Sequence, residues 1–123
     1  MKPIVIVGAG PVGLTTALKL KKLGIKSIIL EKNDVVQNEL RASTFHPPTI
    51  EMLDEIGVAA ELVSIGLKTK CWQFRVHETG EKAVFDLGHI AQDTKYAYRL
   101  QVEQKELCRL ATNKAEADEN IEL

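Results

Sequence analysis

The sequence predicts an α/β fold, and two patterns near its start carry this prediction. Residues 3–7 (PIVIV) form a run of valine and isoleucine, which is typical of a strand fully buried in a parallel sheet. Leucine and alanine then recur at helical spacing over residues 11–23, with lysines on the other face, and residues 27–30 supply a second apolar strand. A strand–helix–strand unit takes about 30 residues, which is the length of chain that these three segments occupy, so we expect them to form such a unit.

The middle of the chain predicts two short helices and a hairpin. A helix is expected from Pro47 to Ile56, because a proline pair suits the first helical turn and three aliphatic residues share one face before Gly57. A second helix is expected over residues 58–64. The alternation in CWQFRVH, the turn-like ETGEK and the following AVFDL predict an antiparallel hairpin within residues 67–100, apart from the parallel sheet.

The end of the chain predicts a helix over residues 103–114 and a strand that begins in the final IEL. We therefore divide the chain into residues 1–66 with the strand–helix–strand unit and the following helices, residues 67–100 with the hairpin, and residues 101–123 with the returning helix. A doubly wound sheet needs further strands, so the domain is expected to be incomplete. The first strand would have an unpaired edge, through which copies could associate.

Charge and cysteine usage exclude several classes of function. Sixteen lysines and arginines balance 17 aspartates and glutamates, so no basic field attracts nucleic acid or an anionic membrane. No apolar segment has the length of a membrane span. Cys71 and Cys108 lie far apart and have no CxxC or histidine-rich neighbourhood, so neither a metal site nor a disulfide framework is expected. We expect a cytoplasmic protein without nucleic-acid or membrane partners.

Three glycines stand between the first strand and the first helix in the pattern GxGxxG. Gly8 permits a tight turn, Gly10 leaves room for a pyrophosphate, and Gly13 lets the helix approach the strand. Amides at the helix start, at the positive end of the helix dipole, would then meet phosphate. Glu31, which ends the next strand, would accept hydrogen bonds from adenosine ribose hydroxyls and repel a 2′-phosphate, which favours FAD or NAD over NADP.

This pattern defines a candidate dinucleotide site in a Rossmann-like unit. The alternative is that the glycines only end the strand and begin the helix, with no ligand. However, the flanking strand, the helical periodicity and the acidic Glu31 all agree with a role in binding. Lys32 by itself is typical of a solvated neighbour. The candidate cofactor-binding residues of this unit are Gly8, Ala9, Gly10, Pro11, Val12, Gly13, Glu31 and Lys32.

Resemblance to a known family is carried by three stretches: PIVIVGAGPVGLTTALKLKKLGIKSIILEK, RASTFHPPTIEMLDEIG and YRLQVEQKEL. Together they resemble the N-terminal part of the FAD-dependent aromatic-ring hydroxylases, whose best-known fold is that of p-hydroxybenzoate hydroxylase. The similarity extends over nearly the whole chain. It implies a flavin monooxygenase that takes electrons from NADH or NADPH and uses dioxygen to hydroxylate a small aromatic substrate.

The resemblance also implies roles for residues outside the glycine loop. Arg41 would reach the FAD near its pyrophosphate and ribitol, where a permanently charged fork suits phosphate oxygens, although a surface salt bridge is the alternative. Gln101 would hydrogen-bond the flavin side, and Gln104 lies close enough to compete for that role. We assign no catalytic residue, because in this family the flavin does the difficult chemistry while the protein orients and shields it.

Two later motifs of the family, an Asp-Gly segment and a Gly-Asp segment, are not found before the chain ends at Leu123. We therefore expect a fragment that is inactive alone and binds FAD weakly or not at all. Two alternatives stay open. One is a different FAD- or NAD-dependent oxidoreductase that shares only the strand–helix–strand unit, and the other is a non-enzymatic remnant with a nucleotide-binding shape.

Overall fold

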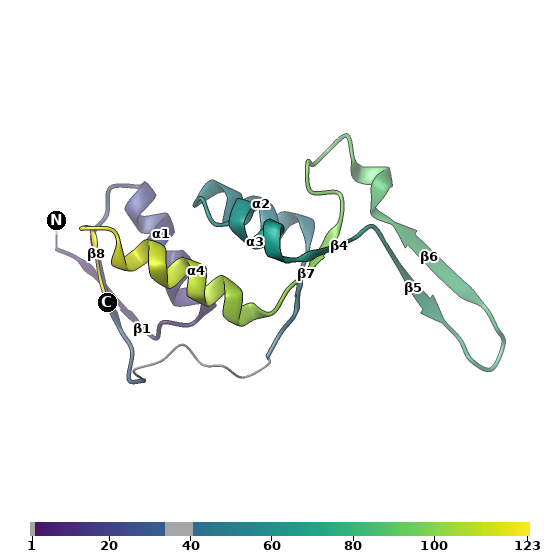
Figure 1. Ribbon diagram of the computed structural model, residues 1–123, viewed down its shortest axis with the longest axis horizontal. Helices are drawn as coiled ribbons and strands as arrows, with labels where there is room; N and C mark the ends of the chain where they lie inside the picture. The colour runs from purple at the N-terminus through teal and green to yellow at the C-terminus, as the bar shows by residue number, and fades with distance from the viewer. Residues whose placement is uncertain (1, 34–40) are drawn as a thin grey trace.

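The computed structural model describes residues 2–33 and 41–123 and has the predicted mixed α/β architecture (Figure 1). No helix in the described part of the chain is long and apolar enough to cross a bilayer. The elements in chain order are β1 (Ile4–Val7), α1 (Pro11–Lys22), β2 (Ser27–Leu30), β3 (Thr44–Phe45), α2 (Pro47–Glu55), α3 (Ala59–Ile65), β4 (Leu67–Thr69), β5 (Cys71–Arg75), β6 (Lys82–Asp86), the 3₁₀ helix η1 (Leu87–Ile90), β7 (Arg99–Gln101), α4 (Gln104–Glu116) and β8 (Ile121–Glu122).

A three-stranded parallel sheet has the order β1-β2-β8. Strands β1 and β2 pair along their whole length, and β8 begins opposite the first residue of β2. Right after β1 the chain forms α1, so the predicted strand–helix–strand unit and the strand at the chain end are both confirmed. Since β8 runs parallel to β2, the preceding helix α4 must start toward the carboxyl ends of the strands, where α1 also starts.

The first strand is more exposed than its apolar run predicts. Val5 is 57% exposed and Val7 is 84% exposed, whereas Ile6 is half-buried against the core. Within the described residues β1 pairs with β2 alone, and the buried face of the sheet is the one that carries Ser27 and Ile29. The prediction of a fully buried first strand is therefore wrong for this chain, while its unpaired edge is confirmed.

A second sheet, antiparallel and of order β3-β7-β4, connects segments that lie far apart in the sequence. Thr44 of β3 and Leu67 of β4 both lie opposite Gln101 of the central strand β7. Backbone hydrogen bonds continue past the strands, from the Val102 amide to the Ser43 carbonyl at 3.0 Å. This sheet therefore fixes the segment before α2 against the start of α4.

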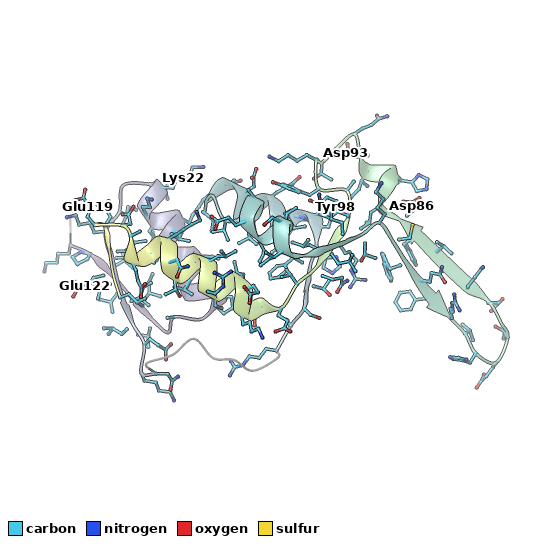
Figure 2. The ribbon with its side chains drawn as sticks, viewed as in Figure 1. Lys22, Asp86, Asp93, Tyr98, Glu119 and Glu122 are labelled. Atoms are coloured by element: carbon cyan, nitrogen blue, oxygen red, sulfur yellow. The ribbon has the colours of Figure 1, made fainter. Side chains whose placement is uncertain are left out.

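The predicted hairpin is present as a separate two-stranded sheet of β5 and β6, in which Trp72 lies opposite Phe85. It extends away from the helices, with Asp86 at its base and Tyr98 between that base and the helices (Figures 1 and 2). The hairpin covers fewer residues than the range 67–100, because β4 and β7 belong to the second sheet, where β7 pairs with both β3 and β4. The division of the chain into three segments stays a prediction.

The core lies between the helices and the sheets. Helix α1 begins at Pro11 as predicted, and α1 and α2 are each followed by a glycine in the left-handed region, Gly24 at φ +72° and Gly57 at φ +76°. Each fully buried large aliphatic side chain contributes about 1.5–3 kcal/mol. The residues with no exposed surface, which come from all four α-helices, from strand β7 and from the connection before α3, are Leu14, Ala17, Ile50, Val58, Ala59, Leu62, Leu100, Ala111 and Ala115.

Candidate nucleotide-binding site

The glycine loop joins β1 to α1 at the carboxyl end of the parallel sheet. Gly8 has φ +103°, a backbone conformation that residues with a side chain rarely adopt, and its amide donates to the Leu30 carbonyl at 2.7 Å. This bond continues the β1–β2 ladder, after which the chain turns sharply into the helix. The loop conformation therefore requires glycine at this position, as the sequence predicts.

Gly13 and Gly10 differ in what a side chain would meet. A Cβ atom on Gly13 would lie 2.0 Å from the Gly8 carbonyl oxygen, so the close approach of α1 to the loop requires a glycine. A Cβ on Gly10 would meet no described atom within 4 Å, and its φ of −76° suits any residue. The described residues give no steric or conformational reason for glycine here, so Gly10 fits a position kept bare for a ligand.

The start of α1 presents backbone donors without a side-chain cap. Gly10 is the N-cap, it makes no capping side-chain bond, and the first helical turn carries no acidic residue. Pro11 has no amide proton, and the Leu14 amide donates to the Gly10 carbonyl at 3.0 Å. The amides of Val12 and Gly13 are the donors at this helix end that an anion could use.

Glu31 points its carboxylate toward the glycine loop. Its Oε2 accepts a hydrogen bond from the Ala9 amide at 2.8 Å, and its Oε1 accepts from the backbone and side-chain amides of Asn33, both at 3.0 Å. The bond from Ala9, followed by that from Asn33, lowers the pKa of the Glu31 carboxyl below its usual value. The side chain is exposed, as is that of Lys32, so a ribose can reach the carboxylate.

The two glutamines and Arg41 lie on neighbouring segments. The Gln104 amide donates to the Ala42 carbonyl at 2.8 Å, which places Arg41 beside the start of α4. Burial raises the pKa of the Cys108 thiol on α4, and the positive charge of Arg41 opposes that shift. Arg41 is exposed, whereas Gln101 and Gln104 are half-buried.

Gln101 has a side-chain partner within the protein. The Thr44 hydroxyl donates to its amide oxygen at 2.8 Å across the β3–β7 pair. This leaves the amide NH₂ group of Gln101 available to a ligand acceptor. Gln104 is the first residue of α4, at the same end of the parallel sheet as the glycine loop.

Two residues of this region were not predicted from the sequence. Asn33 lies two residues after Glu31 and donates to it, but no sequence motif predicts an asparagine there. Thr44 contacts Gln101 only because β3 pairs with β7, which the sequence does not predict. Among the described residues, no three His, Cys, Asp or Glu side chains are grouped so that they could hold a metal ion.

Comparison with known proteins identifies the family of this chain. Residues 1–122 match the family described as FAD binding domain, and the chain therefore belongs to that family. It is 36% identical over 121 residues to the para-nitrophenol 4-monooxygenase of a Pseudomonas species, which covers 98% of this chain and 30% of that enzyme. It is 35% identical over 120 residues to the 6-hydroxy-3-succinoylpyridine 3-monooxygenase HspB of Pseudomonas putida, again covering 98% of this chain and 30% of the relative.

The crystal structure of the p-nitrophenol 4-monooxygenase PnpA from Pseudomonas putida DLL-E4 is similar to this chain with a TM-score of 0.88 and 34% sequence identity. The match covers 99% of this chain and 31% of that one. The chain thus spans about 30% of the length of these relatives, all of which are monooxygenases. The resemblance to FAD-dependent aromatic hydroxylases is confirmed.

Proposed function

We propose that this chain is the FAD-binding part of a flavin monooxygenase that takes electrons from NADH or NADPH and uses dioxygen to hydroxylate a small aromatic substrate. The observation that carries the proposal is the glycine loop, with Gly13 packed against the Gly8 carbonyl and Gly10 facing open space. The parallel pairing of β1, β2 and β8 supports a Rossmann-like arrangement around it. The relatives named for nitrophenol and hydroxypyridine compounds favour an aromatic substrate.

The residues on the carboxyl end of the parallel sheet fit an FAD molecule. Its pyrophosphate suits the uncapped start of α1 and the bare backbone of Gly10, where a Cβ would occupy the open space. Glu31 would accept from the adenosine ribose, and Arg41 would bind the pyrophosphate or ribitol with its charged fork. Gln101 or Gln104 would contact the flavin side. The FAD supplies the redox chemistry, and the residues of this chain bind and orient it.

The proposal predicts that Gly10→Ala weakens FAD binding without destabilising the fold. A methyl group at this position meets no described atom, so the free energy of unfolding should change by less than about 1 kcal/mol. The same methyl group would stand where a pyrophosphate approaches the backbone, so the dissociation constant should rise about tenfold or more, which equals about 1.4 kcal/mol. Because this chain is expected to bind FAD weakly or not at all, ultrafiltration over a wide range of FAD concentrations suits the measurement.

Gly13→Ala is the matched variant for this experiment. Its methyl group would clash with the Gly8 carbonyl, so the fold should lose about 3 kcal/mol of stability. An unchanged FAD affinity in Gly10→Ala would contradict the proposed pyrophosphate site. NAD that binds more tightly than FAD would favour a different dinucleotide-dependent oxidoreductase.

Association between copies is a further part of the proposal. The unpaired edge of β1 and the exposed Val5 and Val7 beside it are features through which sheets pair with other chains. Sedimentation of the purified chain over a range of concentrations tests this directly, since a concentration-independent monomer would exclude it.

A further inference from the structure

The link between Glu31 and Ala9 continues the β1–β2 pairing beyond the backbone ladder. The last ladder bond runs from the Gly8 amide to the Leu30 carbonyl at 2.7 Å. The next amide along the loop, that of Ala9, donates to the Glu31 carboxylate at 2.8 Å instead of to a main-chain carbonyl. The side chain at the end of β2 thus takes over as acceptor at the point where the two strands diverge.

This link acts on a segment with little conformational preference of its own. Ala9 stands between Gly8 and Gly10, and glycines leave the backbone free to sample many conformations. A charge-assisted hydrogen bond to one amide in such a loop restricts the neighbouring amides as well. The carboxylate of Glu31 therefore holds the loop in the conformation that presents the start of α1.

Asn33 holds the carboxylate in turn. Its backbone amide and its side-chain amide both donate to Oε1 of Glu31, so the oxygen that does not bind Ala9 is fixed from the other side. An exposed glutamate otherwise samples several rotamers, and each would move Oε2 away from the loop. The lowered pKa of the Glu31 carboxyl agrees with a carboxylate that accepts bonds from both Ala9 and Asn33.

We propose that Asn33 is a positioning residue of the cofactor site, which orients Glu31 so that its carboxylate fixes the Ala9 amide and with it the glycine loop. This inference rests on the proposed FAD-binding function, because a pre-ordered loop matters to a ligand held by its amides. Glu31 then has two roles, as an acceptor for the ribose and as the tether of the loop that meets the phosphates. Asn33 acts on FAD only through Glu31.

The tether is tested in the chain without any cofactor, by amide hydrogen exchange measured with NMR. Glu31→Ala removes the acceptor, so the Ala9 amide should exchange about tenfold faster than in the wild type. Asn33→Ala leaves the acceptor and the backbone donor of residue 33 but removes the side-chain donor, so the carboxylate is held less firmly and exchange at Ala9 should accelerate about threefold. Asn33→Ser, which keeps a side-chain donor, should restore part of the protection. Glu78→Ala, which removes an exposed carboxylate from the hairpin turn, should change nothing at Ala9.

The outcomes separate the parts of the inference. An Ala9 exchange rate that is the same in wild type and Glu31→Ala would overturn the tether. Acceleration in Glu31→Ala without any effect of Asn33→Ala, or with no rescue by Asn33→Ser, would overturn the positioning role of the Asn33 side chain. Both substituted positions are exposed, and slow exchange of the amides in α1 and α4 would verify that each variant is folded.

FAD binding by the same variants separates this inference from the proposed function. If the wild type binds FAD and Asn33→Ala raises its dissociation constant about threefold, both stand. If the wild type binds FAD and Asn33→Ala binds equally well, the positioning role fails while the proposed function survives. If the wild type does not bind FAD even at high concentration, this chain alone does not form a cofactor site, and the positioning role toward a cofactor fails for the chain alone. The exchange rates still decide whether the tether exists.

Discussion

The helices and the β5–β6 hairpin stabilise their apolar side chains in different ways. Helix α1 buries Leu14 completely and packs along α4, and together these helices cover one face of the parallel sheet. In the hairpin, none of residues 71–86 is buried, and Phe74 is 63% exposed. The rings there contact one another instead: Trp72 and Phe85 stack at 4.3 Å between centroids.

The difference shows that an apolar pattern indicates which face of a strand or helix is hydrophobic, but not whether another element covers that face. Alternating aromatic residues predict the hairpin correctly, and a two-stranded hairpin alone is marginally stable. The valines of β1 show the same effect inside the parallel sheet. We therefore expect the helices to dominate stability and the hairpin to respond locally.

The largest effect is expected for Leu14→Ala in the helical core. Leu14 has no exposed surface, so truncation leaves a cavity and should lower the free energy of unfolding by about 3 kcal/mol. Urea denaturation followed by the circular dichroism of the helices measures this change. Leu23→Ala is the matched control, because Leu23 is 64% exposed, and its effect should stay below about 0.5 kcal/mol. Equal effects of both substitutions would contradict the packing described for α1.

A smaller and local effect is expected for Phe74→Ala in the hairpin. The Phe74 ring meets Trp72 edge-on at 5.0 Å between centroids, a contact worth about 1 kcal/mol. Trp72 is the only tryptophan in the sequence, so its fluorescence reports on the hairpin while circular dichroism reports on the helices. We expect the fluorescence transition to move to lower urea and the helical transition to stay in place. A loss of helical stability as large as that of Leu14→Ala would show that the hairpin belongs to the same cooperative unit.

The smallest effect is expected at the segment that joins the hairpin to β7. The Lys95 side chain donates to Asp54 of α2 at 2.6 Å, and this bond is the largest cause of a lowered pKa of the Asp54 carboxyl. Because the pKa of the Asp54 carboxyl in the folded chain lies below its ordinary value, the carboxylate stabilises the fold fully above that ordinary value, and the stabilisation is lost as pH falls through the folded pKa. Thermal melts of wild type and Asp54→Asn should differ slightly at pH 6 and converge in strong acid. A difference in melting temperature between wild type and Asp54→Asn that increases as the pH falls would contradict the predicted direction of this pH dependence.

Local patterns were enough to predict much of the fold. The strand–helix–strand unit depends on residues close in sequence, and the turn at Gly8 and the close approach at Gly13 follow from a motif with fixed spacing. The β3-β7-β4 sheet could not be predicted, because it pairs strands of two or three residues that lie far apart in the chain. The prediction that β1 is fully buried was wrong, because the composition of a strand does not indicate what covers the second face of its sheet.

The candidate site shows the same division, because its local motif could be predicted from the sequence and its side-chain contacts could not. The glycine motif located the loop and Glu31, since both belong to one local unit. The bond from Ala9 to Glu31 and the contribution of Asn33 depend on side-chain rotamers, which no sequence spacing encodes. The roles of Arg41, Gln101 and Gln104 toward FAD stay predictions.

Amide chemical-shift mapping during an FAD titration tests the central claim most directly, because it locates even weak binding on individual residues. We predict that the shifts concentrate at Gly10, Val12 and Gly13 and at the tether between Ala9 and Glu31, and that the hairpin amides of residues 71–86 stay unchanged. Shifts confined to the hairpin or to the exposed face of β1 would contradict the claim that this loop is the FAD site.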